Sequence, residues 1–169
     1  MSVPSRRILR VEKYVKKILE ANVYDVAIQT PLEVAPLLSS RTGSEVLLKR
    51  EDMQPVFSFK VRGAYNKISR LTPREKKKGV ITASAGNHAQ GVAMAATTLG
   101  IRSRIVMGEN TPSIKIDAVK AFGGEVILHG DTYDEAAGFA RKEATRSGAI
   151  YIHPFDDADV IAGQGTIGM

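Results

Sequence analysis

The sequence contains no cysteine, which excludes disulfides, thiolate metal sites and a cysteine nucleophile. No apolar run approaches membrane-spanning length, and the N-terminus lacks the apolar core of a secretory signal. These absences predict a cytoplasmic protein that does not contact a membrane.

The remaining composition is typical of a globular protein. The 169 residues are 43% hydrophobic and 25% charged, enough for one domain with a sizeable core or for parts of two. The net charge is +6, but the basic residues are spread out, and the run Lys76-Lys77-Lys78 has no interleaved aromatic residues. We therefore expect a solvated face and no nucleic-acid partner. A basic anion-binding module remains a weak alternative, which strongly salt-dependent binding to nucleic acid would support.

Local patterns predict several elements in the first half of the chain. Residues 7–21 are amphipathic and predict a helix, with apolar side chains that include Ile8 and Val15 on one face. Thr30-Pro31 is typical of a helix start and predicts a short helix from Leu32 to Ser40. Residues 45–49 are a strand candidate, and residues 72–75 form a capping-box sequence that opens another short helix.

From residue 79 onward, strand-like and helical patterns alternate. Four strand-like runs cover residues 80–83, 101–106, 125–128 and 149–152, and three helical patterns cover residues 87–99, 113–122 and 132–146. A glycine suited to the left-handed position follows each helix: Gly100, Gly123 and Gly148. This alternation predicts an α/β fold with a right-handed parallel sheet and flanking helices.

Lys60 is the first candidate for chemistry. Ser58 is a suitable N-cap for a helix that runs to about Leu71, and Lys60 would then lie in its first turn. The positive end of a helix and the apolar neighbours Phe57 and Phe59 both lower the pKa of an amine. A lysine that acts as a nucleophile needs such a pKa. The alternative is an exposed lysine that happens to begin a helix.

The second candidate is the loop after the first parallel strand, since ligands bind beyond the carboxyl ends of such strands. This loop comprises Ser84, Ala85, Gly86, Asn87 and His88. Asn87 would either cap the following helix or point at a bound ring, and capping is favoured. His88 is better explained as a packed or surface histidine than as a base. There is no dinucleotide fingerprint or P-loop, and the spacing of Asp156, Asp157 and Asp159 matches no metal-ligand pattern.

Taken together, the motifs resemble a known family. SFKVRGAYNKI (58–68), followed by TASAGNHAQGVA (82–93), resembles the pyridoxal-phosphate enzymes of the tryptophan-synthase-β type. Within that group, residues 47–68, AFGGEVILHG (121–130) and HPFDDADVIAGQGTIG (153–168) resemble the biosynthetic threonine dehydratases. The resemblance extends from about Ile8 to Met169.

The resemblance implies a division of the chain and roles for individual residues. Residues 1–52 and 161–169 would belong to a larger α/β lobe, and residues 53–160 would form a small lobe that carries the parallel sheet. The cofactor would be pyridoxal 5'-phosphate, held covalently by Lys60, with Asn87 against its ring hydroxyl and Phe59 lining its pocket. Residues 84–88 would hold the substrate carboxylate. The loop for the cofactor phosphate would lie beyond Met169, so the isolated chain is expected to hold the cofactor weakly and to be inactive. Gly163-Gln164-Gly165-Thr166 would begin a helix.

The resemblance also implies an activity. The full-length protein would deaminate L-threonine to 2-oxobutanoate and ammonia, the first step toward isoleucine, and would form a homo-oligomer. A catabolic serine/threonine dehydratase or a serine racemase is the nearest alternative. Racemase relatives carry a serine at the position of Ala85, where an alanine favours elimination. A further alternative is a truncated product that keeps the fold without the activity.

Overall fold

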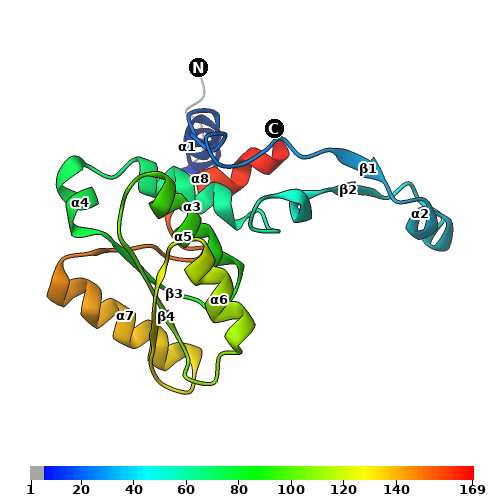
Figure 1. Cartoon of the computed structure of the whole chain (residues 1–169). Coiled ribbons are helices and arrows are strands. Elements are labelled where there is room, and N and C mark those ends of the chain that lie inside the picture. The colour runs from blue at the N-terminus through cyan, green and yellow to red at the C-terminus, as the bar shows by residue number, and fades with distance from the viewer. Residues whose placement is uncertain (1–5) are drawn as a thin grey trace.

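A computed structural model describes residues 6–169, with side chains from residue 11 onward. The predicted alternation forms a four-stranded parallel sheet in the order β5-β4-β3-β6 (Figure 1). Its strands are β3 (Val80–Ala83), β4 (Ser103–Met107), β5 (Glu125–Leu128) and β6 (Ile150–Tyr151). All residues of the two central strands β3 and β4 are buried, because helices cover both faces of the sheet. The prediction of a parallel α/β fold is confirmed.

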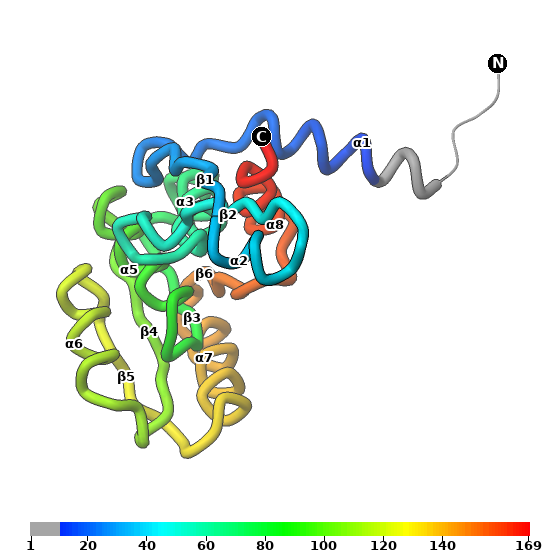
Figure 2. The backbone as a smooth tube through the Cα atoms, turned by 90° about the vertical axis from the view of Figure 1, so that its right-hand side faces the viewer, coloured from blue at the N-terminus to red at the C-terminus, as the bar shows by residue number. Residues whose placement is uncertain are grey.

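The helices around the sheet form two layers (Figure 2). Helices α5 (Asn87–Thr98) and α6 (Ser113–Ala121) lie on one face, and α7 (Tyr133–Ser147) lies on the other. Helix α7 packs on the sheet through small side chains: Ala136, Ala137, Ala140 and Ala144. Gly100, Gly123 and Gly148 have φ angles of 65°, 81° and 74°, so the predicted left-handed positions are confirmed.

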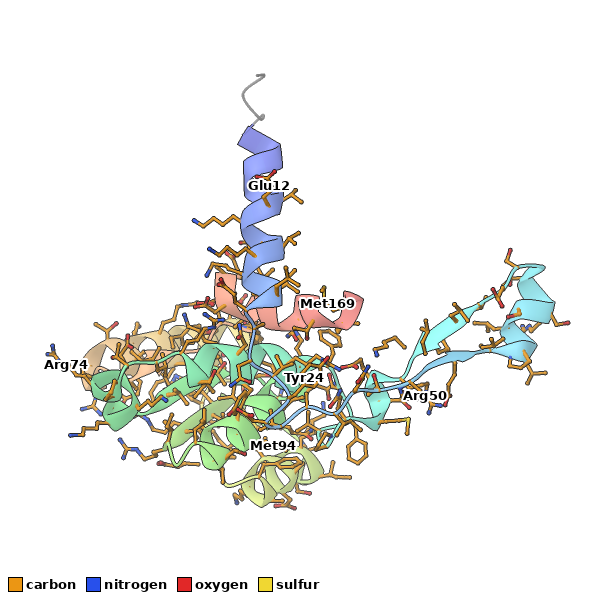
Figure 3. All side chains as sticks on the ribbon, turned by 90° about the horizontal axis from the view of Figure 1, so that it is seen from above. Glu12, Tyr24, Arg50, Arg74, Met94 and Met169 are labelled. Atoms are coloured by element: carbon orange, nitrogen blue, oxygen red, sulfur yellow. The ribbon has the colours of Figure 1, made fainter. Side chains whose placement is uncertain are left out.

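Helix α1 (Arg6–Leu19) confirms the predicted amphipathic helix, although the side chain of Ile8 lies outside the described ones. It stands out from the body of the molecule and contacts α8 (Ala158–Gly165) (Figure 3). Much of its apolar face is exposed, including Val11 at 58% and Leu19 at 64%. No helix in residues 6–169 is long and apolar enough to cross a membrane.

The predicted helix from Leu32 to Ser40 is wrong. Strand β1 (Leu32–Val34) instead pairs antiparallel with β2 (Leu47–Lys49), and the short helix α2 (Pro36–Thr42) begins at the next proline. The hydroxyl of Thr30 donates to Glu51 at 2.6 Å, so Thr30 does not cap a helix. The strands and α2 form an arm that extends from the body (Figures 1 and 3).

Helix α3 (Lys60–Ser69) lies between α5 and α8. The approach is close on both sides. A Cβ on Gly91 of α5 would lie 3.2 Å from the carbonyl oxygen of Lys60, and a Cβ on Gly163 of α8 would lie 2.6 Å from the carbonyl oxygen of Arg62. Glycine at these positions therefore lets both neighbouring helices pack directly against the first turns of α3.

Two predicted helix starts need correction. The residue that precedes α3 is Phe59, which makes no side-chain capping bond, while the Ser58 hydroxyl accepts from the backbone N–H of Lys60 at 3.3 Å. Helix α8 begins at Ala158, where the Asp157 carboxylate accepts from two backbone N–H groups. Gly163-Gln164-Gly165-Thr166 is therefore the end of a helix, and its prediction as a helix start is wrong. The capping box at Thr72 and Glu75 is confirmed and opens α4 (Pro73–Lys78).

Candidate active site

The candidate site lies at the carboxyl edge of the sheet, where the loop after β3 leads into α5. The hydroxyl of Ser84 accepts from the backbone N–H of Gly86 at 3.2 Å, which holds the loop in a tight turn. Gly86 precedes the helix in an extended conformation, so Asn87 is its first residue and does not cap it. The capping interpretation of Asn87 is wrong. Its side chain is exposed at the positive end of α5.

Lys60 is the first residue of α3, and its side chain is half-buried. The Nζ atom donates to the carbonyl oxygen of Pro154 at 2.9 Å and lies 5.4 Å from the centre of the Phe59 ring. No salt bridge among residues 11–169 includes Lys60. Burial lowers the pKa of this amine. The interpretation of Lys60 as a solvent-exposed lysine is therefore not supported.

His88 lies in the first turn of α5 and is 3% exposed. Its Nε2 atom lies 3.2 Å from the carbonyl oxygen of Ile152, which can only accept, so the ring hydrogen is on Nε2. Burial, with a smaller contribution from the charge of Lys60, lowers the pKa of His88 to about 4. The ring is therefore neutral, as expected for a packed histidine. Its Nδ1 atom is buried and has no hydrogen-bond partner in the described part of the chain.

The geometry brings these elements together. The segment that follows β6 supplies the carbonyl of Ile152 to His88 and the carbonyl of Pro154 to Lys60. Gly91, one turn beyond Asn87 on α5, packs against the backbone of Lys60. The amine and the loop from Ser84 to His88 therefore share one edge of the sheet.

A pocket of about 120 Å³ adjoins this loop, and Lys60 is not among the residues that line it. Ser84 and Ala85 form one wall, and the end of β4, the loops that follow β4 and β5, and the start of α7 form the rest. The pocket is lined by Ser84, Ala85, Val106, Met107, Gly108, Asn110, Thr111, Asp131, Thr132, Tyr133 and Ala136.

The sequence patterns did not identify a buried ion pair beside Lys60. Arg62 is 1% exposed, and its guanidinium donates to both carboxylate oxygens of Glu51, at 2.7 and 2.8 Å. It also donates to the carbonyl of Ile28 at 3.1 Å and to the hydroxyl of Thr166 at 3.2 Å. One side chain thus joins α3 to three segments that are distant in the sequence. The only sequence signal was a charged residue between Val61 and Gly63, on a helix start rich in apolar residues.

The aspartates near the start of α8 pair with lysines. Asp157 accepts from Lys67 at 2.8 Å, and Asp159 accepts from Lys17 at 2.9 Å. These pairs tie α1 and α3 to the start of α8.

Comparisons with known proteins place these motifs in context. The profile of the family described as "Pyridoxal-phosphate dependent enzyme" matches residues 23–169. The biosynthetic, chloroplastic threonine dehydratase 1 of Solanum lycopersicum is 56% identical over 157 residues, which are 93% of this chain and 26% of the relative. The biosynthetic L-threonine dehydratase IlvA of Pasteurella multocida is also 56% identical, over 93% of this chain and 31% of the relative. The chain thus spans less than a third of these relatives.

Solved structures show the same fold. The processed form of threonine deaminase isoform 2 from Solanum lycopersicum matches with a TM-score of 0.90 and 57% identity, over 94% of this chain and 46% of that chain. Maize serine racemase matches with a TM-score of 0.86 and 34% identity, over 90% of this chain and 47% of that chain.

Proposed function

Because this chain belongs to the family of pyridoxal-phosphate dependent enzymes, we propose that it supplies Lys60 and the loop from Ser84 to His88 to a site for pyridoxal phosphate and an amino acid. The observation that carries the proposal is the state of Lys60. Its amine is half-buried, has a lowered pKa, and is held by a carbonyl instead of a carboxylate. Such an amine is neutral more often than a surface lysine, as covalent capture of an aldehyde requires.

The other residues of the site also fit this cofactor. The ring of Phe59 is 38% exposed beside the amine and offers an apolar surface to an aromatic ring. The exposed amide of Asn87, at the start of α5, is suited to bind a ring hydroxyl. These residues therefore suit the end of the cofactor that carries the aldehyde and the ring hydroxyl.

The chain's residues would then divide the work as follows. The backbone N–H groups of Ala85, Asn87 and His88 and the Ser84 hydroxyl bind and orient the substrate carboxylate, helped by the positive end of α5. The N–H groups of Ser84 and Gly86 already donate to the carbonyl of Val106 and to the Ser84 hydroxyl. The amine of Lys60, in its neutral form, takes the proton from the substrate Cα. When bound, the cofactor supplies an electron sink for the charge left on Cα. The β-hydroxyl leaves with a proton as water, and hydrolysis of the enamine that remains gives the 2-oxo acid and ammonia.

We propose L-threonine as the substrate, with 2-oxobutanoate and ammonia as products, in the biosynthesis of isoleucine. The names of the two threonine dehydratases support this assignment. The proposal concerns a protein as long as these relatives, of which this chain covers less than a third. In that protein, residues 1–52 and 161–169 would join a larger lobe around the small lobe of residues 53–160, and the subunits would form a homo-oligomer.

We also propose a cytoplasmic location. The Solanum lycopersicum relatives are named as chloroplastic, so an organelle is the alternative. Cell fractionation with an antibody against this chain distinguishes the two locations.

The test is an assay of 2-oxo-acid and ammonia formation from L-threonine and L-serine with added pyridoxal phosphate. It is run on this chain alone and on a chimera in which the chain replaces the matching part of the Pasteurella multocida enzyme. We expect the chimera to consume threonine faster than serine. A folded chimera that binds the cofactor but does not deaminate threonine would contradict the proposal. The assay of the chain alone tests the alternative that it keeps the fold without activity.

Serine racemase is the second candidate, because the maize enzyme shares the fold at 34% identity. Ala85 is the residue that bears on this alternative, since it belongs to the loop proposed to hold the substrate and its side chain has no group that can donate a proton. We expect Ala85→Ser in the chimera to introduce formation of D-serine from L-serine, at a rate below that of elimination. Chiral chromatography measures it, and Ala85→Gly is the matched control without a hydroxyl. D-serine from the unaltered chimera would instead favour the racemase assignment.

A further inference from the structure

The turn that follows β6 is closed around one imidazole ring. The Nδ1 atom of His153 accepts from the backbone N–H groups of Phe155, at 3.3 Å, and Asp156, at 2.8 Å. The ring also meets that of Phe155 edge-on, with centroids 4.7 Å apart. An imidazole nitrogen that accepts carries a lone pair, so the hydrogen of this ring is on Nε2. His153 therefore fixes the backbone of residues 153–156 by hydrogen bonds and by packing.

Pro154, inside this turn, supplies the carbonyl that accepts from Lys60 at 2.9 Å. Pro154 is buried, and its ring fixes its own φ angle, so the turn sets the direction of its carbonyl. The carbonyl of Ile152, two residues before Pro154, is held separately by the Thr82 hydroxyl at 2.7 Å and by His88. The position of the Lys60 amine thus depends on the part of the turn that His153 closes.

We propose that His153 is a positioning residue for Lys60. It acts through the carbonyl of Pro154 and keeps the amine half-buried at the edge of the sheet. The proposal rests on the proposed function of Lys60 as the residue that captures the cofactor. Nothing in the motif 58–68 indicates such a role, because His153 lies 93 residues beyond Lys60 in the sequence.

Other interactions hold both ends of this turn independently of His153. The backbone N–H of Ile152 donates to the carbonyl of Ile81 in β3 at 2.8 Å. At the other end, the carboxylate of Asp157 caps α8 and pairs with Lys67 at 2.8 Å. Loss of the His153 acceptor should therefore release residues 153–156 and leave the sheet and α8 in place. If His153 contributed only to overall stability, its replacement would weaken folding but would leave the acetylation midpoint of Lys60 unchanged.

Two substitutions separate the acceptor from the ring. His153→Phe keeps an aromatic ring beside Phe155 but removes Nδ1. His153→Asn removes the ring but keeps an acceptor, since an asparagine oxygen commonly accepts from the backbone two or three residues further on. The readout is the pH dependence of acetylation of Lys60 by trace acetic anhydride, mapped by mass spectrometry, with the exposed Lys115 of α6 as internal reference. The unaltered 169-residue chain and both variants are compared, and circular dichroism confirms that each is folded.

We expect the midpoint for Lys60 to lie below that for Lys115 in the unaltered chain. His153→Phe should raise it, because water reaches the amine and removes the burial that lowers its pKa. His153→Asn should keep the midpoint of the unaltered chain. An unchanged midpoint in His153→Phe, or a raised one in His153→Asn, would overturn the proposal. If His153→Phe does not fold, a raised midpoint in His153→Asn still overturns the proposal. The labelling needs no cofactor, so a result that overturns the role of His153 can be told apart from a result that overturns the proposed function.

Discussion

Replacing Lys60 by alanine in the chimera is expected to lower kcat/KM for L-threonine by at least about 10³-fold, the scale of losing a positioned acid–base group. The variant loses both the amine that captures the cofactor and the base that takes the Cα proton. Lys60→Arg should be equally inactive, because a guanidinium keeps its proton at any working pH. Steady-state kinetics with threonine measures both variants.

The matched control is Lys115→Ala, which removes an exposed lysine from α6. It should leave kcat/KM within about twofold of the parent, since surface substitutions usually change little. Retention of threonine deamination by Lys60→Ala, above a tenth of the parent rate, would remove Lys60 from the mechanism.

Replacing Arg62 by methionine is expected to lower the free energy of unfolding by about 3–5 kcal/mol, because it leaves the carboxylate of Glu51 buried without its partner. Burial raises the pKa of Glu51, but hydrogen bonds from Arg62 and Thr30 outweigh it and hold the pKa below its usual range. The carboxylate of Glu51 is therefore charged in the folded protein at neutral pH. The contribution of the pair to the free energy of unfolding is lost as the pH falls below about 4.5, where the carboxylate is protonated. Urea unfolding at pH 7 measures the change.

The double variant Arg62→Met with Glu51→Leu should recover part of the lost stability, since no unpaired charge remains. Arg146→Met serves as the control, because Arg146 pairs with Glu143 at 2.7 Å while its side chain is 77% exposed. Because the Arg146 side chain is exposed and Glu143 keeps its bond to Arg104, Arg146→Met should change the free energy of unfolding much less than Arg62→Met does. Equal effects of Arg62→Met and Arg146→Met would show that burial of the Arg62 pair has little energetic consequence.

The sheet could be predicted because its signals are local. Each strand is a short β-rich run, and each helix ends at a glycine that the structure places at positive φ. The first 58 residues were harder, because distant contacts decide their structure. Thr30-Pro31 has the form of a helix start, but Thr30 bonds to Glu51, 21 residues away, and the chain continues as a strand.

The same reasoning explains what was found and missed at the candidate site. Lys60 and the loop from Ser84 to His88 were recognised from motifs in which chemistry and spacing coincide. Asn87 was interpreted as a cap because asparagine favours that position, but the preceding glycine takes it. The contacts of Arg62 and Lys60 with the C-terminal part of the chain span 104 and 94 residues, so no local pattern could reveal them.

The account depends on the amine of Lys60 being the group that captures the cofactor. The most direct measurement is incubation of this chain with pyridoxal phosphate, reduction with borohydride, and mass-spectrometric mapping of the modified lysine, with Lys60→Arg as the control. We predict that Lys60 carries the adduct at cofactor concentrations where the other lysines remain unmodified, and that the control carries none. An adduct on another lysine in preference to Lys60 would contradict the account.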